Sequence, residues 1–191
     1  ALGTFDDGSG PALYAGGTFT TAGGSPVHHI ARWDGTAWGP VGTGVRRLGG
    51  ATTYVAALEV FDDGSGLSLF AGGWFSVAGG ERAYDIARWD GASWHPVGRG
   101  LNNGVFDLEV LDDGTGSALY AGGFFTRAGS VPALGIARWD GVEWSALGAG
   151  VDDRVDTLAV FRGPSGGRAL FVGGAFPTSP AGDPYFARWQ P

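Results

Sequence analysis

The segment Leu13-Tyr14-Ala15-Gly16-Gly17 is followed by Ile30-Ala31-Arg32-Trp33-Asp34-Gly35 and then by Trp38. The pattern is present three more times, and its further copies begin at Leu69, Leu119 and Leu170. Successive Gly-Gly pairs lie 56, 50 and 51 residues apart. A period of this length is typical of repeat proteins in which each copy forms one small structural unit.

Four copies fill the 191 residues, so we predict one repeat domain rather than several independent domains. Hydrophobic residues make up 43% of the sequence, which is enough for a buried core. Glycine contributes 38 residues without a Gly-X-Y period, which indicates a turn-rich β protein. The predicted units are residues 1–52, 53–101, 102–151 and 152–191.

Each copy contains four short strand signals separated by turn residues. The first strand is clearest at residues 55–61, 105–111 and 155–161. In the first three copies an Asp-Asp-Gly turn closes a hairpin to the second strand, which ends in Gly-Gly and therefore marks a bulge or a close approach between sheets. The spacing between the Gly-Gly pair and the Ile-Ala-Arg-Trp strand is too long for a tight hairpin. We therefore predict a loop of roughly ten residues between them. The last strand opens with a Trp, and no segment has a helical pattern.

Antiparallel units of four strands at this period predict an all-β chain that forms the blades of a β-propeller. The chain stops at Pro191, before a fourth strand of the fourth copy, so we predict four blades of which the last is incomplete. A ring commonly closes by pairing strands from both ends of a chain. We therefore expect either a second copy or adjoining sequence of a longer protein to pair with the incomplete blade.

A hydrophobic strand ending in Gly-Gly, an aromatic-Asp turn and a downstream Trp resemble the kelch family of β-propeller repeats. The longer pattern Ile-Ala-Arg-Trp-Asp-Gly-x-x-Trp-x-x-Leu-Gly-x-Gly is still more similar to the kelch-like blades of cortical cell-polarity marker proteins and of repetitive surface proteins. The resemblance covers essentially the whole chain and implies the propeller fold. It implies no particular activity, because kelch propellers range from scaffolds to an oxidase. The chain departs from the family where kelch repeats usually have Tyr, at Trp33, Trp89, Trp139 and Trp189.

Composition and charge narrow the classes of partner. The net charge of −7 argues against nucleic acids and anionic membranes, and no apolar run is long enough to span a membrane. The absence of Cys excludes disulfides and catalytic thiols, and all 12 basic residues are Arg. We expect a secreted or cell-surface location, although no signal-peptide pattern is recognised within these residues.

The Asp-Asp-Gly turns have two interpretations. Asp6-Asp7, Asp62-Asp63 and Asp112-Asp113 offer clustered oxygen atoms that hard cations such as calcium prefer. Each turn, however, offers only two adjacent carboxylates and lacks the alternating Asp positions of known calcium loops. Turn formation explains these residues more simply.

An Arg recurs inside the third strand of every copy, at positions 32, 88, 138 and 188. An Arg that is present in every copy is better explained by a structural role than by a role in a single active site. A buried guanidinium requires a partner, so we expect carboxylates such as Glu59 and Glu109, or backbone carbonyls, to hold these side chains.

No catalytic or metal-binding pattern is present. The three His residues have no metal-ligand spacing, no Gly-x-Ser-x-Gly elbow exists, and the Gly-rich segments do not open helices. We therefore predict a protein that is not an enzyme and that uses neither a metal nor a cofactor. A pair of carboxylates acting on a glycan remains open at this point.

The predicted topology places the two short turns of each copy at one end and the long loops and inter-copy links at the other. The turns are nearly identical between copies, whereas the long loops differ, which favours a rigid scaffold with binding loops. We predict a binding or scaffold module for an unidentified protein or glycan partner; the alternatives are a glycan-binding or carbohydrate-active protein and a structural subunit of a surface layer or filament. The candidate binding residues are Arg82, Arg127, Tyr84, His28, Trp74 and Arg99.

Overall fold

The computed structural model describes residues 1–164, 166–177, 182 and 185–189. Within this part of the chain all regular structure is β-strand, and no residue is helical. The prediction of an all-β protein is therefore confirmed. The described part accordingly contains no helix of the length and apolarity that crossing a membrane requires.

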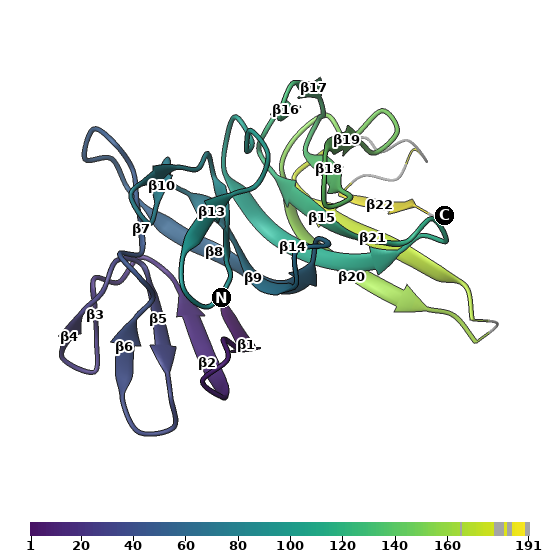
Figure 1. The fold of residues 1–191 in the computed structure, drawn as a ribbon. Helices are drawn as coiled ribbons and strands as arrows, with labels where there is room; N and C mark the ends of the chain where they lie inside the picture. Colours follow the sequence, from purple (N-terminus) through teal and green to yellow (C-terminus); the bar gives the residue numbers. More distant parts are fainter. Residues whose placement is uncertain (165, 178–181, 183–184, 190–191) are drawn as a thin grey trace.

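Each copy forms one main antiparallel sheet, and the sheets follow one another across the molecule from its purple to its yellow end (Figure 1). The first sheet contains β1 (Leu2–Asp6), β2 (Pro11–Gly16), β5 (Ile30–Trp33) and β6 (Trp38–Pro40). The second contains β8 (Tyr54–Asp62), β9 (Leu67–Trp74), β12 (Ile86–Trp89) and β13 (Trp94–Pro96). The third contains β14 (Val105–Asp112), β15 (Ser117–Gly123), β18 (Ile136–Trp139) and β19 (Trp144–Ala146). The fourth contains β20 (Val155–Arg162), β21 (Arg168–Gly174) and β22 (Phe186–Trp189).

The acidic turns have the structural role that the sequence predicts. In the first sheet one carboxylate oxygen of Asp6 accepts hydrogen bonds from the backbone amides of Gly8 (2.9 Å) and Gly10 (3.0 Å). Gly8 has a φ of 92°, a conformation that other residues rarely adopt. Asp62 accepts the same two bonds, from Gly64 and Gly66, and Asp112 accepts the first of them, from Gly114. The Asp-Asp-Gly sequence thus closes the hairpin between the first two strands of each of these sheets.

The Gly-Gly pair is placed where the backbone of the first strand bulges. In the second sheet the pairing of β8 with β9 shifts between Val55 and Ala57, opposite Gly72 and Gly73. A Cβ at Gly72 would lie 2.6 Å from the side chain of Val105 in the next sheet. Both interpretations of the glycines, a bulge and a close approach between sheets, are therefore confirmed.

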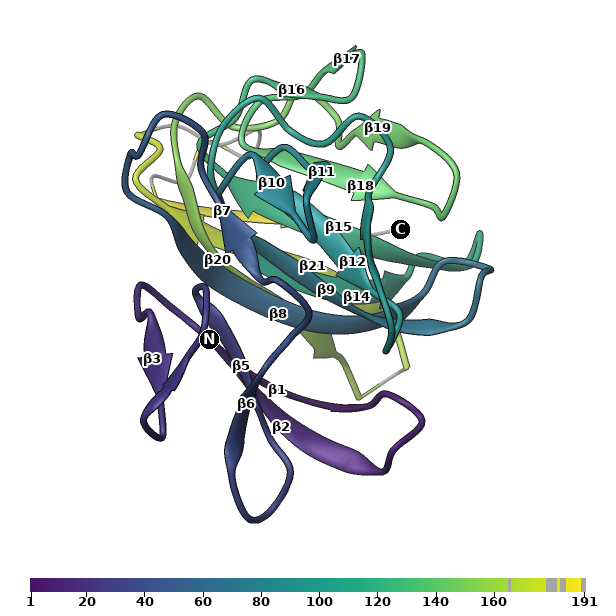
Figure 2. The same cartoon turned by 60° about the vertical axis from the view of Figure 1, so that its left-hand side comes forward.

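Successive sheets pack face to face, and β1 and β2 lie next to β8 of the second sheet (Figure 2). We call the face that a sheet turns to the following sheet its forward face, and the opposite one its rear face. The forward face of the second sheet packs on the third sheet, and its rear face packs on the first. In the second sheet the forward face carries Phe61, Phe70 and Ile86, and the rear face carries Leu69, Ala71 and Trp89.

The loops after the Gly-Gly pairs contain small hairpins that the sequence pattern does not predict. They are formed by β3 (Thr21–Ala22) with β4 (Ser25–Pro26), β10 (Val77–Ala78) with β11 (Glu81–Arg82), and β16 (Arg127–Ala128) with β17 (Val131–Pro132). In addition, β7 (Val45–Arg46), from the link between the first two sheets, pairs with β10. The long loops are thus ordered parts of the scaffold.

Candidate functional site

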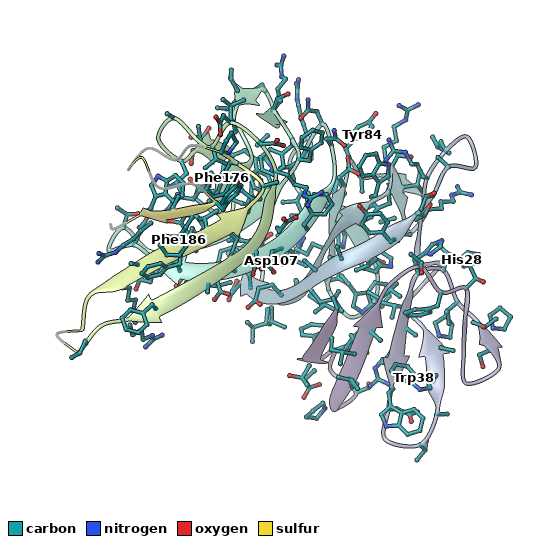
Figure 3. All side chains as sticks on the ribbon, turned by 180° about the vertical axis from the view of Figure 1, so that it is seen from behind. His28, Trp38, Tyr84, Asp107, Phe176 and Phe186 are labelled. Atoms are coloured by element: carbon teal, nitrogen blue, oxygen red, sulfur yellow. The ribbon has the colours of Figure 1, made fainter. Side chains whose placement is uncertain are left out.

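The long loops and the inter-sheet links meet at one end of the molecule, as the predicted topology requires. The backbone amide of Val45 donates to the carbonyl of His28, that of Leu101 to Tyr84, and that of Val151 to Leu134. His28, Tyr84 and Leu134 therefore occupy the same position of three copies, and all three are exposed. His28 and Tyr84 are labelled in Figure 3. The same backbone arrangement, repeated in three copies, therefore presents three chemically different side chains.

A cavity of about 360 Å³ lies between the loops of the second and third sheets. It brings together Tyr84 from the long loop of the second sheet, Arg99 from the link to the third sheet, and Arg127 from the long loop of the third sheet. Three of the six candidate residues are therefore neighbours in space. Two guanidinium groups beside an exposed phenol form a site with the chemistry to bind a carboxylate.

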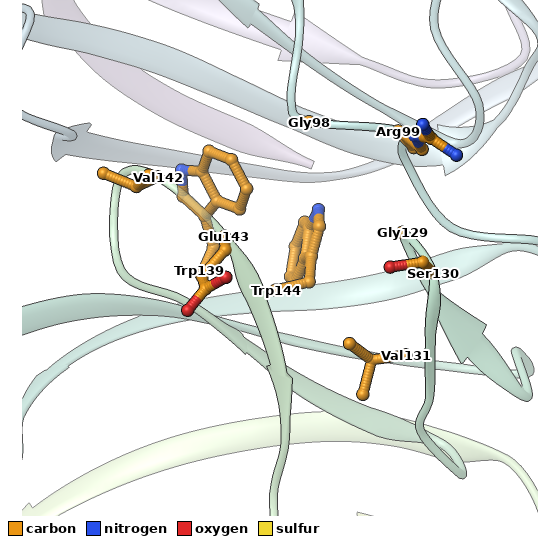
Figure 4. A pocket seen from close by; sticks show the side chains of 9 residues that line it. All are labelled: Gly98, Arg99, Gly129, Ser130, Val131, Trp139, Val142, Glu143 and Trp144. Atoms are coloured by element: carbon orange, nitrogen blue, oxygen red, sulfur yellow. The ribbon is translucent and has the colours of Figure 1, made fainter.

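A second cavity of about 180 Å³ adjoins the first, because both are lined by Arg99 and Gly129 (Figure 4). Its floor contains the indoles of Trp139 and Trp144, which pack with ring centroids 5.3 Å apart. Trp144 also donates its indole N–H to the carbonyl of Val97 in the preceding link, at 3.2 Å. Both indoles are buried, so they mainly join the two sheets.

A third cavity of about 140 Å³ adjoins the first at Asn102. Exposed apolar side chains, those of Phe124 and Leu134, line it together with the carboxylate of Asp153. We call these three adjoining cavities the loop groove. Its centre carries the two Arg residues, and its exposed apolar side chains include Tyr84.

The other candidate residues lie beside the loop groove or away from it. Arg82 donates to the hydroxyl of Tyr84 at 2.9 Å and so neighbours the first cavity. Trp74 is half-buried, with the Arg47 guanidinium 4.7 Å from its ring centroid and the Tyr54 ring at 6.4 Å. Trp74 and His28 do not line the three cavities.

Sequence reasoning missed Asn102 and Phe124. The side-chain oxygen of Asn102 accepts hydrogen bonds from the backbone amides of Thr126 and Arg127, both at 2.9 Å. Asn102 therefore fixes the loop that carries Arg127. The available signal was that Asn bonds to nearby backbone groups more readily than most residues, but nothing in the sequence pairs position 102 with a loop of the next copy.

In the first three sheets the Arg of the third strand binds the acidic turn of its own sheet. The guanidinium Nε lies 2.9 Å from a carboxylate oxygen of Asp7 for Arg32, 3.4 Å from Asp63 for Arg88, and 3.0 Å from Asp113 for Arg138. Hydroxyl groups of the same turns also accept hydrogen bonds from these side chains, as Ser9 does from Arg32. The acidic turns thus close a hairpin and hold a cation at the same time.

The expectation that Glu59 and Glu109 hold these Arg side chains is wrong. Glu59 and Arg88 share a face of the second sheet, but both pair in register with Phe70 of the strand that lies between them. The buried ring of Phe70 fills the space that separates the two charges. Arg88 therefore extends along the sheet toward the turn, where Asp63 lies.

Ionisation in these clusters follows from the contacts. Partial burial opposes the charge of Asp7, but hydrogen bonds from Ser9 and Tyr14 and the nearby Arg32 outweigh it, so the pKa of Asp7 is lowered. Burial and the hydrogen bond to Asp7 raise the pKa of Tyr14 to about 12. At physiological pH the carboxylate of Asp7 is therefore charged and the phenol of Tyr14 is neutral. In these states Asp7 can accept the hydrogen bonds from Ser9 and Tyr14.

Glu59 on β8 and Glu109 on β14, two strands of neighbouring sheets that contact each other, form an acidic pair that interacts electrostatically. Burial and the charge of Glu109 raise the pKa of Glu59 to about 7. Burial and Asp107 also raise the pKa of Glu109. Glu59 is therefore still partly protonated near neutral pH, and the charge of Glu109 is near enough to affect its ionisation.

This pair predicts a pH-dependent stability. The folded-state pKa of Glu59, about 7, lies above its ordinary value of 4.5, so the folded protein holds this proton more tightly than the unfolded chain. The resulting stabilisation is complete below pH 4.5 and is lost as the pH rises to 7. We expect Glu59→Gln to be more stable than the parent protein by about 1 kcal/mol at alkaline pH, after allowance for solvent screening, and equal to it in acid. Urea unfolding at several pH values measures this difference.

Glu143→Gln, at an exposed position, is the control and should show no such dependence. If the difference between Glu59→Gln and the parent protein is constant with pH, Glu59 is not the group responsible.

Comparisons with protein-family models, with curated proteins and with solved structures gave no match to this chain. Within the described residues, no group of three or more His, Asp or Glu side chains is arranged to hold a metal ion. The functional interpretation therefore rests on the geometry of the loop groove and of the acidic pair.

Proposed function

We propose that the four sheets are consecutive blades of a kelch-like β-propeller, the last without its outer strand. The first strands of successive sheets, β1, β8, β14 and β20, are neighbours, as the innermost strands of a propeller are. The forward and rear faces alternate through the stack, which is the packing that repeated blades require. The repeated Gly-Gly, Trp and Asp-Gly positions support the same interpretation.

We further propose that the protein is a non-enzymatic binding module, at the cell surface or outside the cell, whose loop groove binds an acidic segment of a protein partner. The observation that carries this proposal is the meeting of Arg99, Arg127 and Tyr84 in one cavity, with Phe124 and Leu134 exposed nearby. Arg and aromatic residues are enriched in protein interfaces, and an exposed apolar patch next to them favours a macromolecular partner.

The test is a binding screen with acidic peptides and acidic glycans, repeated on the variants Arg99→Glu and Arg127→Glu. We expect each substitution to weaken binding of an acidic peptide by about ten- to a hundredfold, because it replaces a cation facing the ligand with an anion. Isothermal titration calorimetry on the best peptide measures the loss.

Arg46→Glu is the matched control, since Arg46 is exposed on β7 at the same end but does not line the groove. It makes the same charge change and should leave the affinity nearly unchanged. An equal loss in all three variants would mean that only the overall charge matters, and the proposed site would be wrong. Binding of glycans but not of peptides would replace the protein partner with a glycan.

The Glu59–Glu109 pair favours a second candidate, a carbohydrate-active protein. Hydrolysis of a glycosidic bond uses one carboxyl group that is protonated near neutral pH and a second that is ionised. If a panel of glycosides reveals hydrolysis that Glu59→Gln abolishes, this second function replaces the first.

A further inference from the structure

The first and fourth sheets each have a face that no other described sheet covers. On the rear face of the first sheet, the side chain of Leu2 is 70% exposed. The equivalent residues of the other sheets, Leu58, Leu108 and Leu158, are at most 9% exposed, because a preceding sheet packs on them. Leu2 thus occupies a position that is buried in the other three sheets, but no described sheet packs on it.

The forward face of the fourth sheet is uncovered in the same way. Phe161 is 57% exposed, whereas Phe61 and Leu111 at the same position of the second and third sheets are 3% and 2% exposed. Phe186 is 44% exposed, whereas the equivalent Ile86 and Ile136 are fully buried. The rings of Phe161, Phe171 and Phe186 form one continuous aromatic row, with centroids 6.1 and 5.4 Å apart. Such a row is an apolar patch that needs a partner surface.

The two uncovered faces match each other, because three interfaces inside the chain already join a forward face to a rear face. Each of them places the aromatic and Ile positions of one sheet against the Leu, Ala and Trp positions of the next. We propose that the forward face of the fourth sheet docks on the rear face of the first sheet of a second copy of this chain. In this contact Phe161 and Phe186 cover Leu2 and Trp33 of the other copy.

The charges at the turns support this pairing. Where the first three copies have Asp-Asp, the fourth has Arg162-Gly163, so the guanidinium of Arg188 lies over the Phe171 ring, 5.7 Å from its centroid, instead of at a turn aspartate. Inside the chain, the turn after the third strand of one sheet packs on the acidic turn of the preceding sheet, and a Cβ at Gly91 would lie 2.6 Å from the carbonyl oxygen of Asp7. The same packing between copies places the turn Asp34-Gly35 of the first sheet on Gly163, the residue that follows Arg162. Opposite charges meet at this contact, whereas acidic turns meet inside the chain.

The contact is head to tail, because it joins two different faces of the same molecule. Figure 3 shows Phe186 on the fourth sheet and Trp38 on the first sheet at opposite sides of the molecule. A heterologous contact of this kind produces a closed ring or an open filament. The loop groove has no part in it, so the assembly and the proposed binding function can be tested separately.

The test uses the 191-residue chain and light scattering coupled to gel filtration at micromolar concentrations. We expect the parent chain, whose monomer has a mass of 19.5 kDa, to run at twice that mass or a higher whole multiple, and Leu2→Asp and Phe161→Asp each to run as monomers. An equimolar mixture of the two variants should recover a dimer, because one intact forward face and one intact rear face remain. Both residues are exposed in the single chain, so the fold should survive, and near-ultraviolet circular dichroism of the Trp residues verifies this.

Leu48→Asp is the matched control, because Leu48 is 55% exposed in the link between the first two sheets and lies on neither outer face. It should assemble like the parent chain. A monomeric parent chain would overturn the proposal. So would association that persists in Leu2→Asp, which would indicate contact between two fourth sheets or pairing along the edge of β22. A mixture of Leu2→Asp and Phe161→Asp that remains monomeric would exclude the head-to-tail arrangement.

Discussion

Gly73→Ala is expected to destabilise the protein by about 3 kcal/mol or more, the largest effect of any single substitution considered. A Cβ at this position would overlap the carbonyl oxygen of Tyr54 and lie 2.9 Å from the Cα of Val55. Both atoms belong to the bulge of β8, which pairs with β9 on one side and packs on the first sheet on the other. Neither backbone atom can move aside as a flexible side chain would. The overlap can be relieved only by separating the two strands.

Gly39→Ala is the control, because a Cβ at Gly39 would meet no atom within 4 Å and the equivalent positions carry His95 and Ser145. Guanidinium unfolding followed by Trp fluorescence should show a large loss for Gly73→Ala and almost none for Gly39→Ala. Similar stabilities for the two variants would show that the strands at Gly73 are not in close contact.

Arg88→Ala is expected to cost about 2 to 3 kcal/mol of unfolding free energy. The guanidinium is largely buried, lies 3.4 Å from Asp63, and donates to the hydroxyl groups of Ser65 and Ser68. Its removal leaves a partly buried carboxylate with its charge unpaired, and this penalty exceeds the loss of an exposed ion pair.

A double-mutant cycle with Asp63→Ala measures the energy that the two side chains share. The double variant should lose less than the sum of the two single losses. Arg46→Ala, which removes an exposed guanidinium, should change stability by less than about 0.5 kcal/mol. An unchanged melting temperature for Arg88→Ala together with lost ligand binding would reassign Arg88 from the scaffold to a binding site.

The strands and turns could be predicted from local sequence. The alternation in Ile86-Ala87-Arg88-Trp89 gives a strand whatever its neighbours are, and Asp62-Asp63-Gly64 closes a hairpin through bonds to its own backbone. The predicted first strands at 55–61, 105–111 and 155–161 lie inside β8, β14 and β20. The small loop hairpins were missed because two residues per strand are too few to show alternation.

The sequence could predict at which end of the molecule the site lies, but not which residues meet in one cavity. Topology places Tyr84, Arg99 and Arg127 at that end, but their meeting in one cavity depends on how far the third sheet is rotated against the second. Pattern reasoning cannot supply that rotation. The error over Glu59 has a similar origin, because facing the same side of a sheet does not bring two charges together when the ring of Phe70 stands between them.

The hydrogen bonds from Val45, Leu101 and Val151 to residues 28, 84 and 134 have an evolutionary consequence. These bonds use only main-chain atoms, so natural selection can exchange the side chains at the three positions without disturbing the fold. A protein built in this way can acquire a new ligand by point substitution alone, with no insertion or deletion. Duplication of one copy would also duplicate such a position, and each duplicate could then diverge independently.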